Sequence, residues 1–159
     1  MRLKGADYDS AYAIFLTICT KERQCILSNI VGTGVLDGPE IKLTKYGQIA
    51  EKYIHQLNDF YTHLSIECYV IMPNHIHLIL WLKDEENGPS RTPVPTVQNS
   101  KASKFISTFK RFCNKECGEN IWQYRSYDHI IRNSKDYDEH IKYICQNPLT
   151  WQFDKLYSE

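Results

Sequence analysis

The chain has 159 residues, of which 42% are hydrophobic, 13% aromatic and 24% charged. Nineteen basic residues balance nineteen acidic ones, and a net charge of zero argues against a protein that binds duplex DNA simply by being basic. The length fits one domain over residues 1–159. No apolar run approaches the ~20 residues that span a membrane, and no secretion signal is recognisable, so we expect a cytoplasmic protein with no membrane partner.

The first half of the chain alternates strand and helix patterns. Residues 13–20 form a β-rich run that predicts a central strand. The short apolar pieces at 35–36 and 41–43 flank turn residues and predict a small hairpin. Thr44 is placed to cap a helix whose apolar residues continue to Leu57 with helical spacing, although Gly47 weakens its first turn.

Two further strands are predicted at residues 64–71 and 75–82. Only three residues separate them, which is too few for anything except an antiparallel hairpin. Residues 87–100 contain three prolines among polar residues, and this composition predicts a mobile loop. The six cysteines lie mostly in apolar patterns, so we expect free thiols.

The second half of the chain begins with a basic helix at residues 101–115, followed by a strand at 127–132. Ser134 is placed to cap a last helix that Pro148 stops. This order of elements predicts an α+β fold of the ferredoxin-like (RRM-like) kind, with an antiparallel sheet and helices packed on one face. We expect the open face of the sheet to carry the chemistry.

The segment His-Ile-His at residues 75–77 is the most informative feature of the sequence. Successive side chains of a strand point to opposite faces, so His75 and His77 share one face. Their Cα atoms are roughly 7 Å apart by the strand rise, and both imidazoles can reach one cation if a third ligand arrives from elsewhere. The alternative is a pair of histidines on a solvated strand face.

The last helix carries two neighbouring stripes. The predicted core stripe consists of Tyr137, Ile141, Ile144 and Cys145, and a polar stripe of Asp136, His140, Tyr143 and Asn147 lies about a quarter turn away. Tyr143 and Asn147 are i,i+4 neighbours, a geometry that suits a nucleophile beside a metal ligand. A half-buried packing role for the tyrosine and a simple helix end at the asparagine remain the alternative.

Taken together, these segments resemble a known family. The resemblance rests on residues 15–20 (Phe-Leu-Thr-Ile-Cys-Thr), 69–77 (Tyr-Val-Ile-Met-Pro-Asn-His-Ile-His), 122–123 (Trp-Gln), 127–129 (Tyr-Asp-His) and 143–148 (Tyr-Ile-Cys-Gln-Asn-Pro). The ordered set is similar to that of the single-tyrosine HUH endonucleases, which comprise insertion-sequence transposases and REP-associated tyrosine transposases. An asparagine at the end of the last motif is typical of the REP-associated branch.

The resemblance implies a role for each matched residue. His75 and His77 would be metal ligands, Tyr143 the nucleophile and Asn147 the third ligand, with Gln146 as the fallback ligand. The implied activity is a metal-dependent endonuclease and strand transferase, a transposase, that acts on single-stranded or hairpin DNA. Its intermediate would be a 5′-phosphotyrosine, and its metal Mg²⁺ or Mn²⁺. Whether the protein acts as a monomer or a homodimer stays open.

Basic residues of the second half are candidates for binding the DNA, because a basic helix can follow a phosphate backbone. They are Lys101, Lys104, Lys110, Arg111, Lys115, Arg125 and Arg132. Asn74, Asp128 and His129 are possible supporting residues of the site.

Two other functions compete with this interpretation. An RRM-like module can bind RNA without chemistry, although stacking aromatics do not explain His75 and His77. A nucleotide hydrolase of the histidine-triad kind also uses a His-x-His strand, but Ile79 stands where a third histidine is expected.

Overall fold

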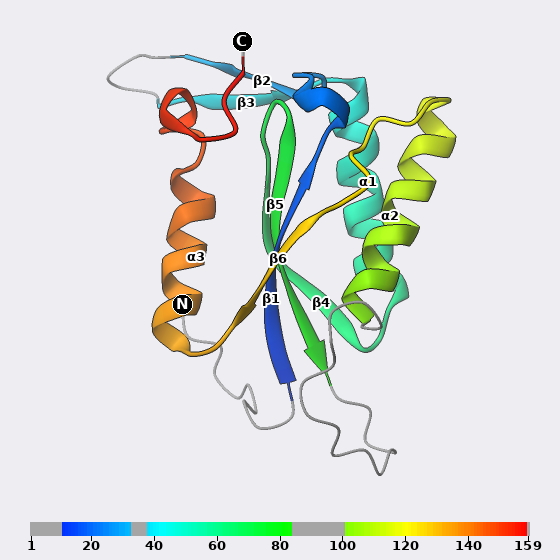
Figure 1. Cartoon of the computed structure of the whole chain (residues 1–159), viewed down its shortest axis with the longest axis vertical. Helices are drawn as coiled ribbons and strands as arrows, with labels where there is room; N and C mark the ends of the chain where they lie inside the picture. Colours follow the sequence, from blue (N-terminus) through cyan, green and yellow to red (C-terminus); the bar gives the residue numbers. More distant parts are fainter. Residues whose placement is uncertain (1–10, 33–37, 84–100, 159) are drawn as a thin grey trace.

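The computed structural model describes residues 11–32, 38–83 and 101–158 (Figure 1). Four antiparallel strands form its main sheet in the order β4-β5-β1-β6. The strands are β1 (Ala11–Cys19), β4 (Leu64–Ile71), β5 (His75–Lys83) and β6 (Tyr127–Ile131). The predicted α+β fold with an antiparallel sheet is confirmed.

The three α-helices of the described residues lie on both faces of this sheet (Figure 1). Helices α1 (Lys45–Phe60) and α2 (Lys101–Cys117) pack on one face, and α3 (Ser134–Gln146) packs on the other. The prediction that all helices share one face was therefore wrong for α3. The reason is that the apolar stripe of α3 finds a second, smaller apolar surface on the opposite side of the strands.

The alternation of side chains along the central strands creates these two cores. On β5, Ile76, Leu78 and Leu80 point into the larger core beneath α1 and α2. Ile79 and Trp81 point to the α3 face, where Ile144 packs against them. Every residue of β5 except Lys83 is buried, because a strand in the middle of a sheet with both faces covered has no solvated side.

A small hairpin lies beside the main sheet, and it differs from the prediction. It pairs β2 (Ser28–Val31) with β3 (Glu40–Leu43), so its first strand precedes the predicted one. The predicted strand at 35–36 and the predicted mobile loop at 87–100 lie outside the described residues.

The helix ends follow capping chemistry. As predicted, Thr44 caps α1, and its side chain accepts a hydrogen bond from the backbone N–H of Gly47. Helix α3 is capped by Asn133 in place of the predicted Ser134, with Asn133 Oδ1 accepting from the N–H of Asp136. Cys145 is exposed and does not belong to the core stripe of α3.

All six cysteines are free, as predicted. Within the described ranges, no helix combines the length and the apolar character needed to cross a membrane.

Candidate functional site

His75 and His77 lie side by side at the start of β5, with ring centroids 4.5 Å apart. Each ring is oriented by a hydrogen bond to its Nδ1 atom. Asn74 Oδ1 lies 2.7 Å from Nδ1 of His75, and Thr17 Oγ1, from the neighbouring strand, lies 2.8 Å from Nδ1 of His77. Such outer partners fix which ring nitrogen faces the centre of a site.

The two Nε2 atoms are buried and have no hydrogen-bond partner among the described residues. Because Asn74 Oδ1 can only accept, Nδ1 of His75 carries the proton and its Nε2 offers a lone pair. Burial lowers the pKa of His75 to about 4 and that of His77 to about 2. Both rings are therefore neutral at neutral pH, the form that binds metal ions.

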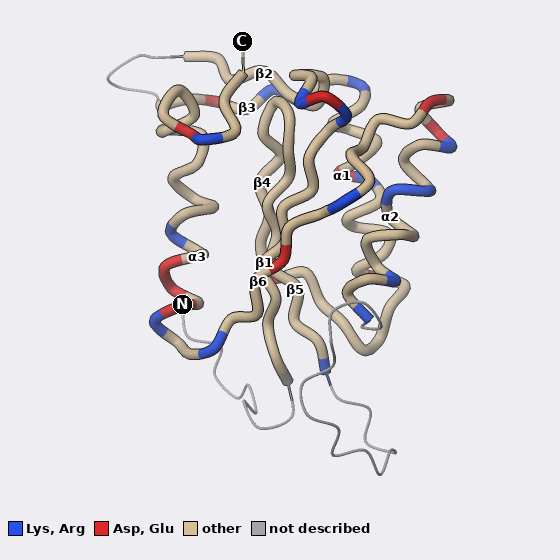
Figure 2. Tube along the Cα trace, in the orientation of Figure 1, with Lys and Arg blue, Asp and Glu red and all other residues tan. Residues whose placement is uncertain are grey.

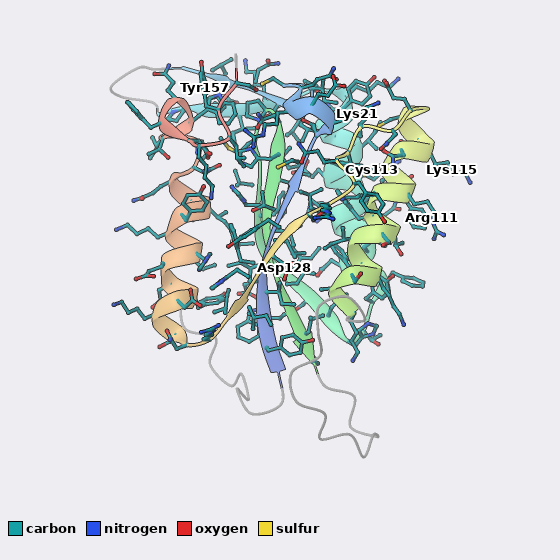
Figure 3. All side chains as sticks on the ribbon, viewed as in Figure 1. Lys21, Arg111, Cys113, Lys115, Asp128 and Tyr157 are labelled. Carbon is teal, nitrogen blue, oxygen red and sulfur yellow. The ribbon has the colours of Figure 1, made fainter. Side chains whose placement is uncertain are left out.

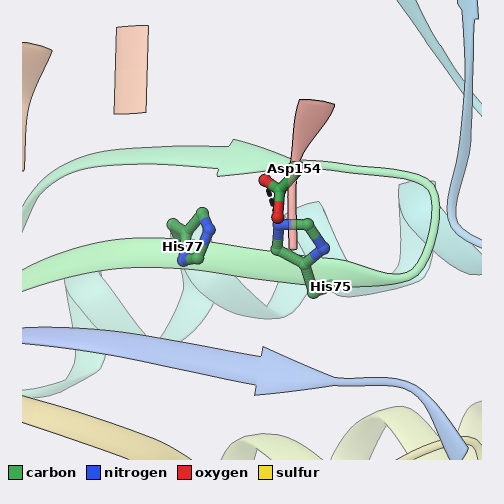
Figure 4. A group of neighbouring side chains, drawn as sticks. All are labelled: His75, His77 and Asp154. Atoms are coloured by element: carbon green, nitrogen blue, oxygen red, sulfur yellow. Dashed lines mark ion pairs between the residues drawn. The ribbon is translucent and has the colours of Figure 1, made fainter. Parts of the chain in front are cut away.

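Asp154 provides a carboxylate beside this pair (Figure 4). Its Oδ2 atom lies 3.9 Å from Nε2 of His75, and its side chain is 1% exposed. A separation of 3.9 Å is too long for a hydrogen bond, but it accommodates a cation with ligand distances of about 2.1 Å to each atom. The ligand atoms of His75, His77 and Asp154 all lie within 4.8 Å of one another.

Asn147 completes the group from the end of α3, where it is buried. Its Nδ2 donates to Asp154 Oδ2 at 2.9 Å, and a carboxylate only accepts, so the Oδ1 atom is the free end of the amide. That oxygen is buried without a partner in the described part of the chain. Gln146, the fallback ligand, is exposed and does not join the group.

These orphaned atoms fit a divalent cation. Two imidazole nitrogens, an amide oxygen and a carboxylate form a mixed N/O donor set with one negative charge, which suits Mn²⁺ and tolerates Mg²⁺. Asp154 was not predicted from the sequence. It follows α3 in the C-terminal turn and carries no local signal, because only the tertiary fold returns it to β5.

Tyr143 lies on the same side of the sheet, with its ring centroid 5.2 Å from that of His77. Its side chain is 37% exposed. Burial raises the pKa of the Tyr143 hydroxyl above its ordinary value, and the Asp154 carboxylate raises it further. The hydroxyl therefore lies within the field of the same carboxylate that faces His75.

An open cleft of about 950 Å³ runs past these residues. His77, Tyr143 and Asp154 line it at one place. Its walls also include aromatic and basic side chains that the sequence analysis did not assign to the site, namely Phe15, Phe153, Arg23 and Lys155, together with Tyr127.

A second group of side chains borders the cleft farther along α3. Asp136 accepts from Nε2 of His129 at 2.9 Å and lies 3.1 Å from Nδ1 of His140. His140 lines the cleft, and His129 lies behind it, with its ring stacked on that of His140 at 4.8 Å between centroids. Asp128 pairs with Leu16 within the sheet and is not a cleft residue.

None of the seven basic residues proposed for DNA binding lines the cleft among the described residues. The Lys110 side chain holds the backbone after α2, because its Nζ donates hydrogen bonds to the carbonyls of Gln123 and Tyr124. Arg111 and Lys115 lie on the outer side of α2 (Figure 3). The basic residues of α2 and those near the C-terminal turn are far apart across the sheet (Figure 2).

The chain is similar to several known proteins in sequence and in structure. No protein-family model matches the chain. A protein of Haemophilus influenzae described as uncharacterized is 28% identical over 170 aligned positions, which cover 99% of this chain and 91% of that protein. A REP-associated tyrosine transposase of Escherichia coli K12 is 34% identical over 96 residues, which cover 60% of this chain and only 50% of that protein.

A solved structure of a REP-associated tyrosine transposase bound to a REP hairpin shares the fold, with a TM-score of 0.62 and 24% identity. The match covers 98% of this chain and 77% of that one. A sheet that holds paired imidazoles, with a tyrosine beside them on α3, is the arrangement that the sequence motifs predicted. Part of the chain is thus similar in sequence to REP-associated tyrosine transposases, and the resemblance predicted from its motifs is confirmed.

Proposed function

We propose that the chain is a metal-dependent endonuclease and strand transferase for single-stranded DNA, with Tyr143 as its nucleophile. The observation that carries this proposal is a cleft lined by Tyr143 and His77, with the orphaned imidazole nitrogen of His75 directly beside that of His77. Tyr143 is 5.2 Å from His77 between ring centroids, and the Nε2 atoms of His75 and His77 are buried without a partner in the described chain. A solely structural role explains neither feature, since an unpaired buried polar atom destabilises a fold.

His75, His77, Asn147 and Asp154 would hold the Mg²⁺ or Mn²⁺ ion. When bound, the ion supplies Lewis-acid polarisation of the scissile phosphate. The protein fixes the geometry around it. Thr17 and Asn74 hold the two imidazole rings, and Asp154 orients the amide of Asn147 so that its oxygen faces inward.

Tyr143 would attack the phosphorus atom. The new bond joins its phenolic oxygen to the 5′-phosphate, the bond from phosphorus to O3′ breaks, and the electron pair leaves with O3′, which takes a proton from solvent water to become a free 3′-hydroxyl. Because burial and Asp154 raise the pKa of the phenol, the hydroxyl is protonated at neutral pH and needs an acceptor for its proton. Asp154, whose charge already acts on that hydroxyl, is our candidate for this role.

The reverse reaction needs no external energy. The phosphotyrosine retains the energy of the broken linkage, so a free 3′-hydroxyl can rejoin the strand and release Tyr143. We infer that Tyr143 serves its own subunit, because its ring contacts His77 of the same chain.

The substrate class follows from the relatives and from the cleft. One related protein is a REP-associated tyrosine transposase bound to a REP hairpin, which makes hairpin DNA the first substrate to test. The site lies in a cleft on the sheet face, and a scissile phosphate within a base-paired stem cannot easily enter it. The unpaired strand beside a hairpin therefore provides the more suitable linkage.

The test is a covalent adduct. A labelled hairpin oligonucleotide with single-stranded flanks is incubated with the protein in Mn²⁺, in Mg²⁺ or in chelator, and resolved on a denaturing gel. We expect an adduct with metal and none in chelator. Tyr143→Phe should abolish the adduct and keep DNA binding, whereas Tyr124→Phe, at an exposed position outside the cleft, should leave the adduct unchanged.

Other outcomes identify the rival functions. Binding without any adduct in every metal would indicate a nucleic-acid-binding module. Cleaved product without an adduct would indicate a hydrolase. An adduct that persists in Tyr143→Phe would move the nucleophile to Tyr127 or Tyr137.

A further inference from the structure

We propose that Phe153 and Tyr127, with Arg23 and Lys155, bind the unpaired nucleotides that flank the scissile phosphate. This inference rests on the proposed function and specifies the part of the DNA that the cleft holds. The four residues are called the flank strip below. All four line the cleft that contains His77 and Tyr143.

The two aromatic side chains are unusually exposed for their type. Phe153 is 88% exposed and Tyr127 is 60% exposed, although both border a concave surface. An aromatic ring contributes to a core only when it is buried, so neither ring has a packing role that matches its size. Exposed aromatic rings along a groove are the platforms on which unpaired bases stack.

Both rings lie next to the residues of the candidate metal site. Phe153 directly precedes Asp154, whose carboxylate faces His75. On the sheet, Tyr127 is in register with Thr17, and Thr17 is in register with His77 on the next strand. Neighbouring strands are about 4.8 Å apart, so the backbone of Tyr127 lies two strand spacings, about 10 Å, from that of His77.

Two cations accompany the rings. Lys155 directly follows Asp154, and Arg23 lies in the short helix η1 (Lys21–Arg23). Both are exposed and line the cleft. The acidic residues of the cleft lining are Glu139 and the buried Asp154. Cations and exposed aromatic rings in one cleft match the chemistry of a single strand, whose phosphates alternate with stackable bases.

A base-paired stem does not fit this strip. The faces of its bases are already stacked on one another, so Phe153 and Tyr127 would gain nothing from it. The flank strip is therefore assigned to the unpaired strand, which leaves the stem of a hairpin to other surfaces.

Binding without cleavage tests this assignment. The full chain is titrated, in chelator, with a fluorescent hairpin that carries single-stranded flanks and with the same hairpin lacking them. Phe153→Leu and Tyr127→Leu should each weaken binding of the flanked hairpin by about 5-fold or more, the effect of losing one stacked base. Phe60→Leu, at another largely exposed phenylalanine at the end of α1, is the matched control and should change nothing.

A double-mutant cycle then assigns the contact to a base. Wild-type protein should lose a similar factor on a flank that is abasic at one nucleotide, and Phe153→Leu should lose no more on that flank. Lys155→Gln should weaken binding of every flanked sequence alike and should reduce the salt dependence. Circular dichroism verifies that each variant is folded.

The results separate this inference from the proposed function. Equal affinity of wild type and both aromatic variants for the flanked hairpin would overturn the inference, and so would an equal loss on the hairpin without flanks. If the flank effects occur but no DNA forms an adduct with Tyr143, the proposed function fails. If the adduct forms and the flank effects are absent, the inference alone fails.

Discussion

Asn147 and Asp154 are joined by a hydrogen bond of 2.9 Å from Nδ2 to Oδ2, which connects the end of α3 to the C-terminal turn. The second carboxylate oxygen accepts from the backbone N–H of Leu156 at 2.8 Å. One carboxylate therefore orients the amide of Asn147, faces His75 and shapes the turn that carries Phe153.

Replacing this carboxylate by an amide tests its electrostatic role. Asp154→Asn keeps the shape of the side chain and removes its charge, so we expect Mn²⁺ affinity to fall by at least about 10- to 100-fold, the loss that is typical even of residues that only orient metal ligands. Isothermal titration calorimetry measures the affinity. Asp138→Asn, at an exposed acidic residue on α3, is the control. If Asp154→Asn leaves the Mn²⁺ affinity unchanged, the Asp154 carboxylate is not part of the metal site.

Metal binding should stabilise the folded chain, because the ligands converge only in the native state. At a Mn²⁺ concentration 100 times the dissociation constant, the gain is about 2.7 kcal/mol, which corresponds to a rise in Tm of roughly 5–10 °C. Differential scanning fluorimetry measures it. His77→Ala should abolish the rise and His55→Ala, on α1, should preserve it; a rise that survives in His77→Ala would mean that Mn²⁺ binds elsewhere.

The buried histidines should make the metal-free protein sensitive to acid. Burial lowers the pKa of His75 to about 4, while its pKa in the unfolded chain is near 6.5. The unfolded chain therefore binds more protons below pH 6.5, and stability falls as the pH drops from about 6.5 towards 4. Because each of the two histidines contributes up to about 3 kcal/mol, urea unfolding in chelator should lose roughly 3–6 kcal/mol over this range.

His77→Phe removes one of the two groups that cause this slope. It should flatten the loss of stability between pH 6.5 and pH 4, even if its stability at pH 7 differs from that of the wild type. A slope as steep as that of the wild type would contradict the assignment of the acid sensitivity to these histidines.

Gly47 should not tolerate a methyl group, although it lies in the first turn of α1. Alanine normally stabilises a helix by about 1 kcal/mol relative to glycine. A Cβ atom at this position, however, would lie 2.0 Å from the carbonyl oxygen of Leu27. We therefore expect Gly47→Ala to destabilise the protein by about 1–3 kcal/mol in urea unfolding, whereas Gln48→Ala, at the exposed neighbour, should have little effect. Stabilisation by Gly47→Ala would contradict this close contact.

The sequence predicted those parts of the site that local periodicity determines. Strand alternation places His75 and His77 on one face, and helical spacing places Tyr143 near Asn147; the structure has both arrangements. Asp154 escaped prediction because its position depends on how the chain returns after α3. A charge pattern alone also cannot reveal that Lys110 donates to two backbone carbonyls.

The face of the sheet on which α3 packs was also predicted wrongly, again because it depends on the tertiary fold. An apolar stripe such as Tyr137, Ile141 and Ile144 predicts that one side of the helix is buried. It does not predict which face of the sheet the helix packs against. That choice depends on Phe15, Ile79 and Trp81, which form a second apolar surface on strands that were already expected to be buried.

The backbone of η1 has a consequence for attempts to engineer this protein. Glu22 and Arg23 have φ angles of 55° and 54°, the left-handed region that costs a residue with a side chain roughly 1–2 kcal/mol. Glycine at either position would relieve that strain, but at position 23 it would also delete a cation from the cleft. Directed evolution for thermal stability alone would therefore favour replacing Arg23 by glycine. The resulting variants should be more stable but should bind DNA more weakly.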